Sequence, residues 1–163
     1  GYTVEQYRST VDMIKESIPE ISLSTDIMVG FPGEKPEDID TLLQLMEYVG
    51  FEDAFTYIYN PREGTAAYSL GDPISREEKV TRLQKVIALQ KKLTGKERRK
   101  RLGQPARVLV EGTSRHNENE LMGSIETDAM VVFPSEPDRI GNFVEVELDE
   151  YRGSTYRGKE LIP

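Results

Sequence analysis

Two segments of the chain carry residues whose types and spacing suit the binding of a flat ligand. In the first, Met28, Val29 and Gly30 end an apolar run and lead into a Pro-Gly turn. A glycine at this point lets a ligand approach the backbone closely, and the methionine offers an apolar side chain to a ring face. The alternative interpretation is an ordinary strand-to-helix turn, in which the glycines serve only the backbone geometry.

The second segment is Phe55-Thr-Tyr-Ile-Tyr-Asn-Pro-Arg-Glu-Gly-Thr65, which contains Tyr59 and Arg62. Arg62 is the only cation between Lys35 and Arg76. A guanidinium group in such a loop suits a carboxylate or phosphate ligand. In the alternative, the aromatic rings pack in a core and Arg62 pairs with Glu63 or another acid.

A third candidate is a basic segment in an otherwise acidic chain. The formal net charge is −8, yet residues 91–103 contain seven basic and one acidic side chain. Such a cluster can contact the phosphates of a nucleic acid. The alternative is a solvated helix end, where cations complement the helix dipole. The candidate RNA contacts in and after this segment are Lys96, Arg98, Arg99, Arg101, Arg107 and Arg115.

The composition argues against several other kinds of chemistry. With no cysteine, these residues can hold no disulfide, thiolate zinc site or cysteine-ligated iron–sulfur cluster. The single histidine, His116, argues against a histidine-rich metal site or a catalytic triad. We therefore assign no catalytic residue and no metal ligand. No run approaches the roughly 18 apolar residues of a membrane-spanning helix, so we expect no membrane partner.

The elements that must position these residues differ between the two halves of the chain. Residues 1–102 predict alternating helices and strands, with strands at about residues 21–29 and 54–59 and a long helix from Ser75 to about Leu102. This alternation is typical of parallel α/β folds, which place ligands at the C-terminal ends of their strands. Residues 104–163 predict five short strands separated by turn residues, as in a small antiparallel barrel or sandwich.

The ordered set of motifs resembles the radical S-adenosylmethionine methylthiotransferases, and within them the C-terminal part of the enzymes that modify tRNA. The resemblance covers essentially the whole chain. It is carried by residues 24–34, residues 55–65, Val108-Leu-Val-Glu-Gly112, Leu121-Met-Gly123 and Tyr156-Arg-Gly158. It departs from the family pattern at Asn60, Glu63 and Ala66, where the family often has Ser-Pro-Arg-Pro-Gly-Thr-Pro.

The resemblance implies a fold for each half. Residues 1–102 would be the C-terminal part of a partial TIM-type radical S-adenosylmethionine barrel with a long connecting helix. Residues 104–163 would be a TRAM domain, a small OB-like antiparallel β-barrel that binds RNA. The parent protein would bind S-adenosylmethionine and two 4Fe-4S clusters, whose cysteines lie in upstream domains. Met28, Val29, Gly30, Tyr59 and Arg62 would contribute to the cofactor site.

The resemblance also implies an activity for the parent protein. Family members of the tRNA type add a methylthio group to C2 of an isopentenyl-modified adenosine beside the anticodon, which implies tRNA as partner and a cytoplasmic location. Without cluster cysteines, this chain is expected to be inactive alone. The alternatives are a methylthiotransferase acting on a ribosomal protein or on threonylcarbamoyl-adenosine, or, in another class, a non-enzymatic RNA-binding module.

Overall fold

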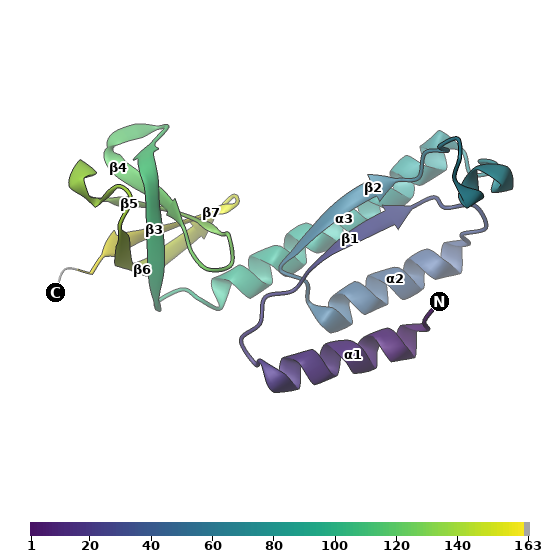
Figure 1. Cartoon of the computed structure of the whole chain (residues 1–163), viewed down its shortest axis with the longest axis horizontal. Coiled ribbons are helices and arrows are strands. Elements are labelled where there is room, and N and C mark those ends of the chain that lie inside the picture. Colours follow the sequence, from purple (N-terminus) through teal and green to yellow (C-terminus); the bar gives the residue numbers. More distant parts are fainter. Residues whose placement is uncertain (162–163) are drawn as a thin grey trace. The chain divides into compact units, whose positions relative to one another are not determined.

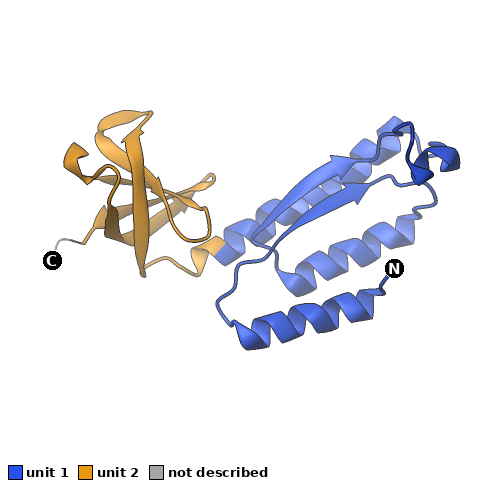
Figure 2. Cartoon of the chain, viewed as in Figure 1, with its two compact units in different colours: residues 1–97 blue, residues 98–163 orange. Residues whose placement is uncertain are grey.

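The computed structural model describes residues 1–161, and the chain divides into two compact units (Figures 1 and 2). The first unit is residues 1–97 and the second is residues 98–163. This division falls a few residues before the predicted boundary at residues 102–104. The last residues of the long helix, from Arg98, belong to the second unit, where Tyr156 Oη donates a hydrogen bond to the carbonyl oxygen of Arg98 (2.7 Å).

The first unit alternates helices and strands, as expected. In chain order its elements are α1 (Val4–Ser17), β1 (Ser24–Val29), α2 (Pro36–Val49), β2 (Asp53–Ile58), η1 (Ala66–Leu70) and α3 (Arg76–Arg99). The helix α1 begins with a capping box, because Thr3 Oγ1 accepts from the Gln6 N–H and Gln6 Oε1 accepts from the Thr3 N–H. The helix α3 runs on to Arg99 without a break at Gly95.

The strands β1 and β2 form a two-stranded parallel sheet, in register from Ser24–Asp53 to Val29–Ile58. One sheet face packs with the three helices around a core that includes Val11, Ile27, Val29, Met46 and Val86. Two strands cannot form a closed barrel. The first unit is therefore a small parallel α/β unit, and its place in a partial TIM-type barrel stays a prediction.

The second unit is a closed five-stranded barrel in the order β3-β4-β5-β7-β6. Its elements are β3 (Pro105–Ser114), β4 (Asn117–Ser124), β5 (Met130–Pro134), η2 (Pro137–Arg139), β6 (Phe143–Arg152) and β7 (Thr155–Glu160). The five predicted strands are all present. Alternate residues of β3 point inward, and Val108 and Val110 join Leu121, Phe133 and Tyr156 in the core.

The prediction of a purely antiparallel barrel is wrong at one pairing. The strands β5 and β7 are parallel, with Met130 opposite Thr155 and Val131 opposite Tyr156. The other four pairings are antiparallel. The physical reason is the strand number, since strand directions cannot alternate all the way around a closed ring of five strands.

No helix within residues 1–161 has the length and hydropathy that crossing a membrane requires.

Candidate functional site

The C-terminal ends of β1 and β2 lie side by side. Val29 is opposite Ile58, and the Tyr59 N–H donates to the carbonyl oxygen of Val29 (2.9 Å). Gly30 follows with a φ of 79°. The parallel pairing thus brings three of the predicted cofactor-site residues, Val29, Gly30 and Tyr59, to one edge of the sheet.

Lys79, from the first turns of α3, fills the space beside Gly30. A Cβ atom on Gly30 would lie 2.5 Å from Cγ and 2.8 Å from Cδ of Lys79. The Lys79 side chain is buried, and its Nζ donates to the carbonyl oxygen of Tyr59 (3.0 Å) and pairs with Asp72. The packing of Lys79 therefore explains why a glycine stands at position 30 without any ligand, and a cofactor contact at this glycine stays a prediction.

Arg82 ties the loop after β1 to the same helix. Its Nη1 lies 2.7 Å from Glu34 Oε1 and its Nε lies 2.8 Å from Glu78 Oε1. Hydrogen bonds to Glu78 and then to Glu34 raise the pKa of Arg82 above its ordinary value. Glu34 Oε1 also accepts from the Gly30 N–H (2.8 Å), so this backbone donor is already used within the protein.

The predicted cofactor residues differ in what they present to solvent. Val29 is fully buried in the helical core. Tyr59 is also buried. Its Oη donates to the carbonyl oxygen of Ala67 (3.1 Å), and its ring packs edge-on against Phe31 (centroids 5.1 Å apart). Met28 and Arg62 are exposed. Of the five predicted residues, these two are the side chains available to a ligand.

Met28 belongs to a sheet face that no helix of residues 1–161 covers. Met28, Phe55 and Tyr57 are 52%, 63% and 49% exposed, and Met28 lies directly opposite Tyr57 in the register. Asp26 lies opposite Phe55 on the same face. Large apolar side chains exposed together mark a surface that another element or a ligand covers.

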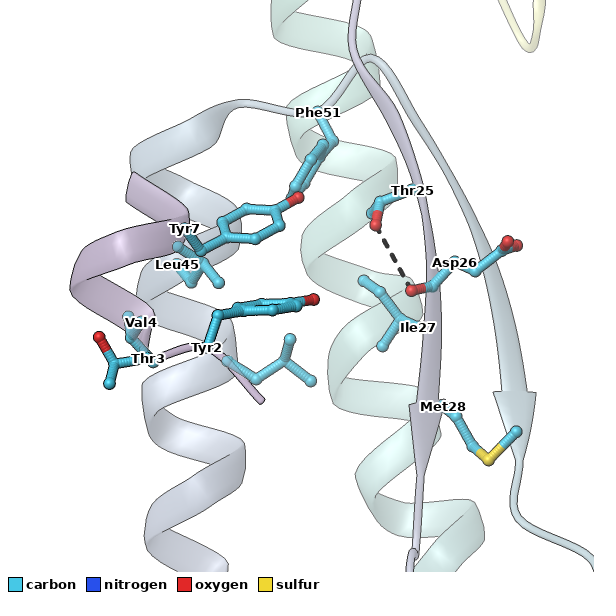
Figure 3. Close-up of a pocket in the computed structure, with 11 residues that line it drawn as sticks. Tyr2, Thr3, Val4, Tyr7, Thr25, Asp26, Ile27, Met28, Leu45 and Phe51 are labelled. Carbon is cyan, nitrogen blue, oxygen red and sulfur yellow. Dashed lines mark hydrogen bonds between the residues drawn. The ribbon is translucent and has the colours of Figure 1, made fainter. Parts of the chain in front are cut away.

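A pocket of about 300 Å³ follows the edge of β1 that faces away from β2 (Figure 3). Its walls include four consecutive β1 residues, Thr25 to Met28, together with Tyr2, Tyr7 and Phe51. Among residues 1–161, β1 pairs only with β2. This edge therefore offers unpaired backbone groups beside an apolar slot, the arrangement that accepts a further strand.

We expect Gly30→Ala to lower the free energy of unfolding of the first unit by about 2 kcal/mol, because the new methyl group meets the pinned Lys79 side chain and the positive φ adds strain. Gly33→Ala is the matched control, since Gly33 has a φ of 90° and no atom within 4 Å of its Cβ position. Urea unfolding of both variants measures the difference. In a Lys79→Ala background, the cost of Gly30→Ala should fall to that of the control. An equal cost in both backgrounds would contradict the role of Lys79.

In the second unit, the end of α3 and the β6–β7 hairpin form one surface. The Arg98 guanidinium is buried and donates to Tyr151 Oη (3.3 Å) and to the carbonyl oxygen of Ser154 (3.2 Å). The Arg99 guanidinium lies 5.9 Å from the centroid of the Tyr151 ring. Arg98 thus holds the hairpin against the helix end. Arg99 and Lys100 at the helix end, and Arg152 at the end of β6, are exposed.

Comparison with known proteins identifies this second unit. Residues 99–160 match the protein-family model of the TRAM domain. These residues are a TRAM domain. The chain as a whole is similar to proteins named tRNA-2-methylthio-N(6)-dimethylallyladenosine synthase. It is 46% identical to the one from Treponema denticola and 49% identical to the one from Treponema pallidum strain Nichols, over 96% of the chain in both cases.

A third relative of the same name, from Methylacidiphilum infernorum, is 39% identical over 99% of the chain. The chain spans about a third of the length of these relatives, 35% in each case. The similarity therefore includes the helix–strand unit as well as the TRAM domain, and it concerns one part of the longer relatives.

The remaining predicted RNA residues do not gather at one point of the TRAM domain. Arg107, near the start of β3, lies over the ring of Phe143, with its Cζ 4.2 Å from the centroid. Arg115 follows the end of β3, eight residues further along the chain and thus at the other end of the strand. Arg101 is half-buried near the helix end, and Lys96 is exposed on α3 just before the TRAM domain.

Several cations on the barrel strands and on η2 form ion pairs. Arg157 pairs with Glu120. The Arg139 Nε lies 3.0 Å from Glu160 Oε1, and Lys159 Nζ lies 3.1 Å from Asp149 Oδ2. Arg99, Lys100 and Arg152 are exposed near the end of α3 and the β6–β7 hairpin, and Arg107 is exposed on β3, so these basic side chains remain candidates for phosphate contact.

The sequence analysis did not predict that several polar side chains of α3 are buried in the first unit. Lys79 and Arg82 are buried as described above, and Gln90 Nε2 donates to the carbonyl oxygen of Phe51 (2.9 Å). Thr94 Oγ1 donates to the carbonyl oxygen of Glu52 (2.6 Å). The available signal was helical spacing, since residues 79, 82, 86, 90 and 93 recur every three or four positions with the buried Val86 and Leu93.

Proposed function

We propose that this chain acts as the C-terminal part of an enzyme that adds a methylthio group to C2 of an isopentenyl-modified adenosine beside the tRNA anticodon. The observation that carries the proposal is the 46% to 49% identity, over nearly the whole chain, to synthases named for that product. The names of these relatives favour the tRNA reaction over modification of a ribosomal protein or of threonylcarbamoyl-adenosine. Similarity in the helix–strand unit argues against a purely RNA-binding module.

In this proposal, upstream domains of the same protein complete the first unit. The slot beside the unpaired edge of β1 would receive a preceding strand, and the uncovered face with Met28, Phe55 and Tyr57 would face the interior of a partial TIM-type barrel. An α/β barrel places its ligands at the C-terminal ends of its strands. That end is where the loops held by Lys79 and Arg82 lie.

The cofactors proposed for the whole protein are S-adenosylmethionine and two 4Fe-4S clusters, which would supply the radical chemistry. This chain has no cysteine for either cluster, so upstream residues must bind them and the chain alone should be inactive. Within this chain, Met28 and Arg62 expose side chains that can contact S-adenosylmethionine. Val29, Gly30 and Tyr59 would shape the same edge through packing and backbone bonds.

The TRAM domain is the proposed tRNA-binding part, which implies a cytoplasmic location with the substrate. Its acidic strands offer little to a polyanion, so we place the phosphate contacts on the exposed Arg99, Lys100 and Arg152. Arg98 contributes by holding the β6–β7 hairpin in place.

A chimera tests the proposal. Residues 1–163 replace the corresponding segment of the Treponema pallidum relative, and the chimera is expressed in cells that lack their own synthase. We expect 2-methylthio-N6-dimethylallyladenosine to reappear in tRNA digests analysed by mass spectrometry. The unfused chain is the negative control. A folded chimera that leaves the dimethylallyl-adenosine unmodified, with the native relative active in the same cells, would contradict the proposal.

A further inference from the structure

The outer face of β3 and β6 carries exposed apolar side chains in a TRAM domain whose surface is otherwise strongly charged. Phe143 is 56% exposed, and Leu109, directly opposite it in the register, is 36% exposed. Ile140, three residues before Phe143, is 42% exposed. An aromatic ring left half in water at the start of a barrel strand contributes little to the core, which lies on the other face of the strand.

The Arg107 guanidinium packs against the Phe143 ring and forms no ion pair with an acidic side chain of residues 1–161. Its cross-strand neighbour is Glu145, yet among residues 1–161 no carboxylate oxygen lies within 4 Å of its guanidinium nitrogens. Its Cζ lies instead 4.2 Å from the centroid of Phe143. The pair therefore presents a flat ring together with a cation whose charge is not neutralised by an ion pair.

The backbone beneath this pair is fixed. The Val110 N–H donates to the carbonyl oxygen of Asn142 (3.0 Å), and the Gly141 N–H donates to the carbonyl oxygen of Val110 (2.9 Å). These bonds pin the start of β6 to β3 just before Phe143. A ring held on a pinned strand loses little conformational freedom when a ligand binds to it.

We propose that Arg107, Leu109 and Phe143 form a stacking platform for an unpaired nucleobase of the tRNA. This inference rests on the tRNA-binding role proposed above and adds a site distinct from the basic surface at the end of α3. An aromatic face on a small β-barrel accepts any base by stacking, and an adjacent arginine adds a cation–π or phosphate contact. Glu145 lies opposite Arg107 and Glu147 lies opposite Pro105, and both carboxylates repel a phosphate backbone, so we place the stacked base at the Phe143 end of this face.

A tryptophan reporter tests the platform directly. The chain contains no tryptophan, so Phe143→Trp creates a single emission site. We expect an unmodified anticodon stem–loop RNA to quench this emission, because a stacked base quenches indole. The control is Tyr68→Trp, at a position of the first unit that is 46% exposed. Its emission should not change with the same RNA.

Affinity measurements give the second test. Phe143→Ala should weaken binding of the full chain to the stem–loop roughly five- to a hundredfold, the range for loss of one stacked base. The salt dependence of binding should stay the same, because no phosphate contact is lost. Tyr68→Ala serves as the matched control, and thermal unfolding should show that both variants stay folded.

Each remaining outcome overturns the platform in a different way. RNA binding with wild-type affinity by Phe143→Ala, and no quenching in Phe143→Trp, would leave the tRNA proposal in place and remove the platform. No binding of the stem–loop by any variant, even in low salt, would remove both. Emission changes that depend on protein concentration rather than on RNA, with a matching change in sedimentation, would show that a second copy of the chain covers the ring.

Discussion

Gly123→Ala is expected to unfold the TRAM barrel, with a loss of about 3 kcal/mol or more in its free energy of unfolding. The Cβ of an alanine at this position would lie 2.1 Å from the carbonyl oxygen of Leu109 and 2.8 Å from Cγ1 of Val108. The first contact is with backbone in a closed barrel, so neither strand can move aside without breaking its ladder. Chemical unfolding followed by circular dichroism measures the loss.

Gly112→Ala is the control for this substitution. Gly112 lies on β3 of the same barrel, and no atom lies within 4 Å of its Cβ position. It should change the free energy of unfolding by less than about 1 kcal/mol. Equal stability of the two variants would show that the barrel has room at Gly123. Gly158 should behave like Gly123, because its Cβ would lie 2.3 Å from the carbonyl oxygen of Glu147.

Replacing Arg99, Lys100 and Arg152 together by Gln should weaken tRNA binding by roughly a hundredfold at 0.1 M salt and flatten its salt dependence. Each phosphate contact contributes about 0.7 to 0.9 to the slope of log affinity against log salt, because it releases condensed counterions. Loss of three contacts should therefore lower the slope by roughly two units. Fluorescence anisotropy of labelled tRNA across a salt series measures both quantities.

The matched control replaces Lys35, Arg76 and Lys85 by Gln. These three side chains are exposed in the first unit, so the control removes the same charge far along the sequence from the TRAM domain. It should leave the slope unchanged. If both triple variants lose the same affinity, the effect is one of net charge, and the surface around Tyr151 is not the RNA interface.

Much of the local structure was predictable because its causes are local. The capping box at Thr3, the two strands of the first unit and all five strands of the barrel follow from residue type and spacing. The parallel pairing at β5–β7 was not predicted, because the closure of an odd-numbered ring is a property of the whole barrel. The motif glycines Gly123 and Gly158 were recognised by resemblance alone, and their crowding by a neighbouring strand explains them.

The candidate sites were predictable as segments but not as surfaces. The sequence placed Gly30, Tyr59 and the basic run 91–101 correctly at strand ends and at a helix end. It could not show that Lys79 occupies the space beside Gly30, nor that Arg98 turns inward to Ser154. Both contacts join residues about 50 positions apart. A lysine and an arginine are also common at the surface, so residue type alone did not predict their burial.

The sequence by itself determined which elements form and, through ordered motifs, which family they resemble, because capping, periodicity and turn chemistry act within a few residues. Only the tertiary structure decided which charged side chains are buried and which are exposed. Burial depends on what packs opposite each side chain. Lys79, Arg82 and Arg98 are therefore buried, where they hydrogen-bond to neighbouring segments. The same packing left Met28 and Phe143 exposed, because their strands turn one face to a core and the other to solvent.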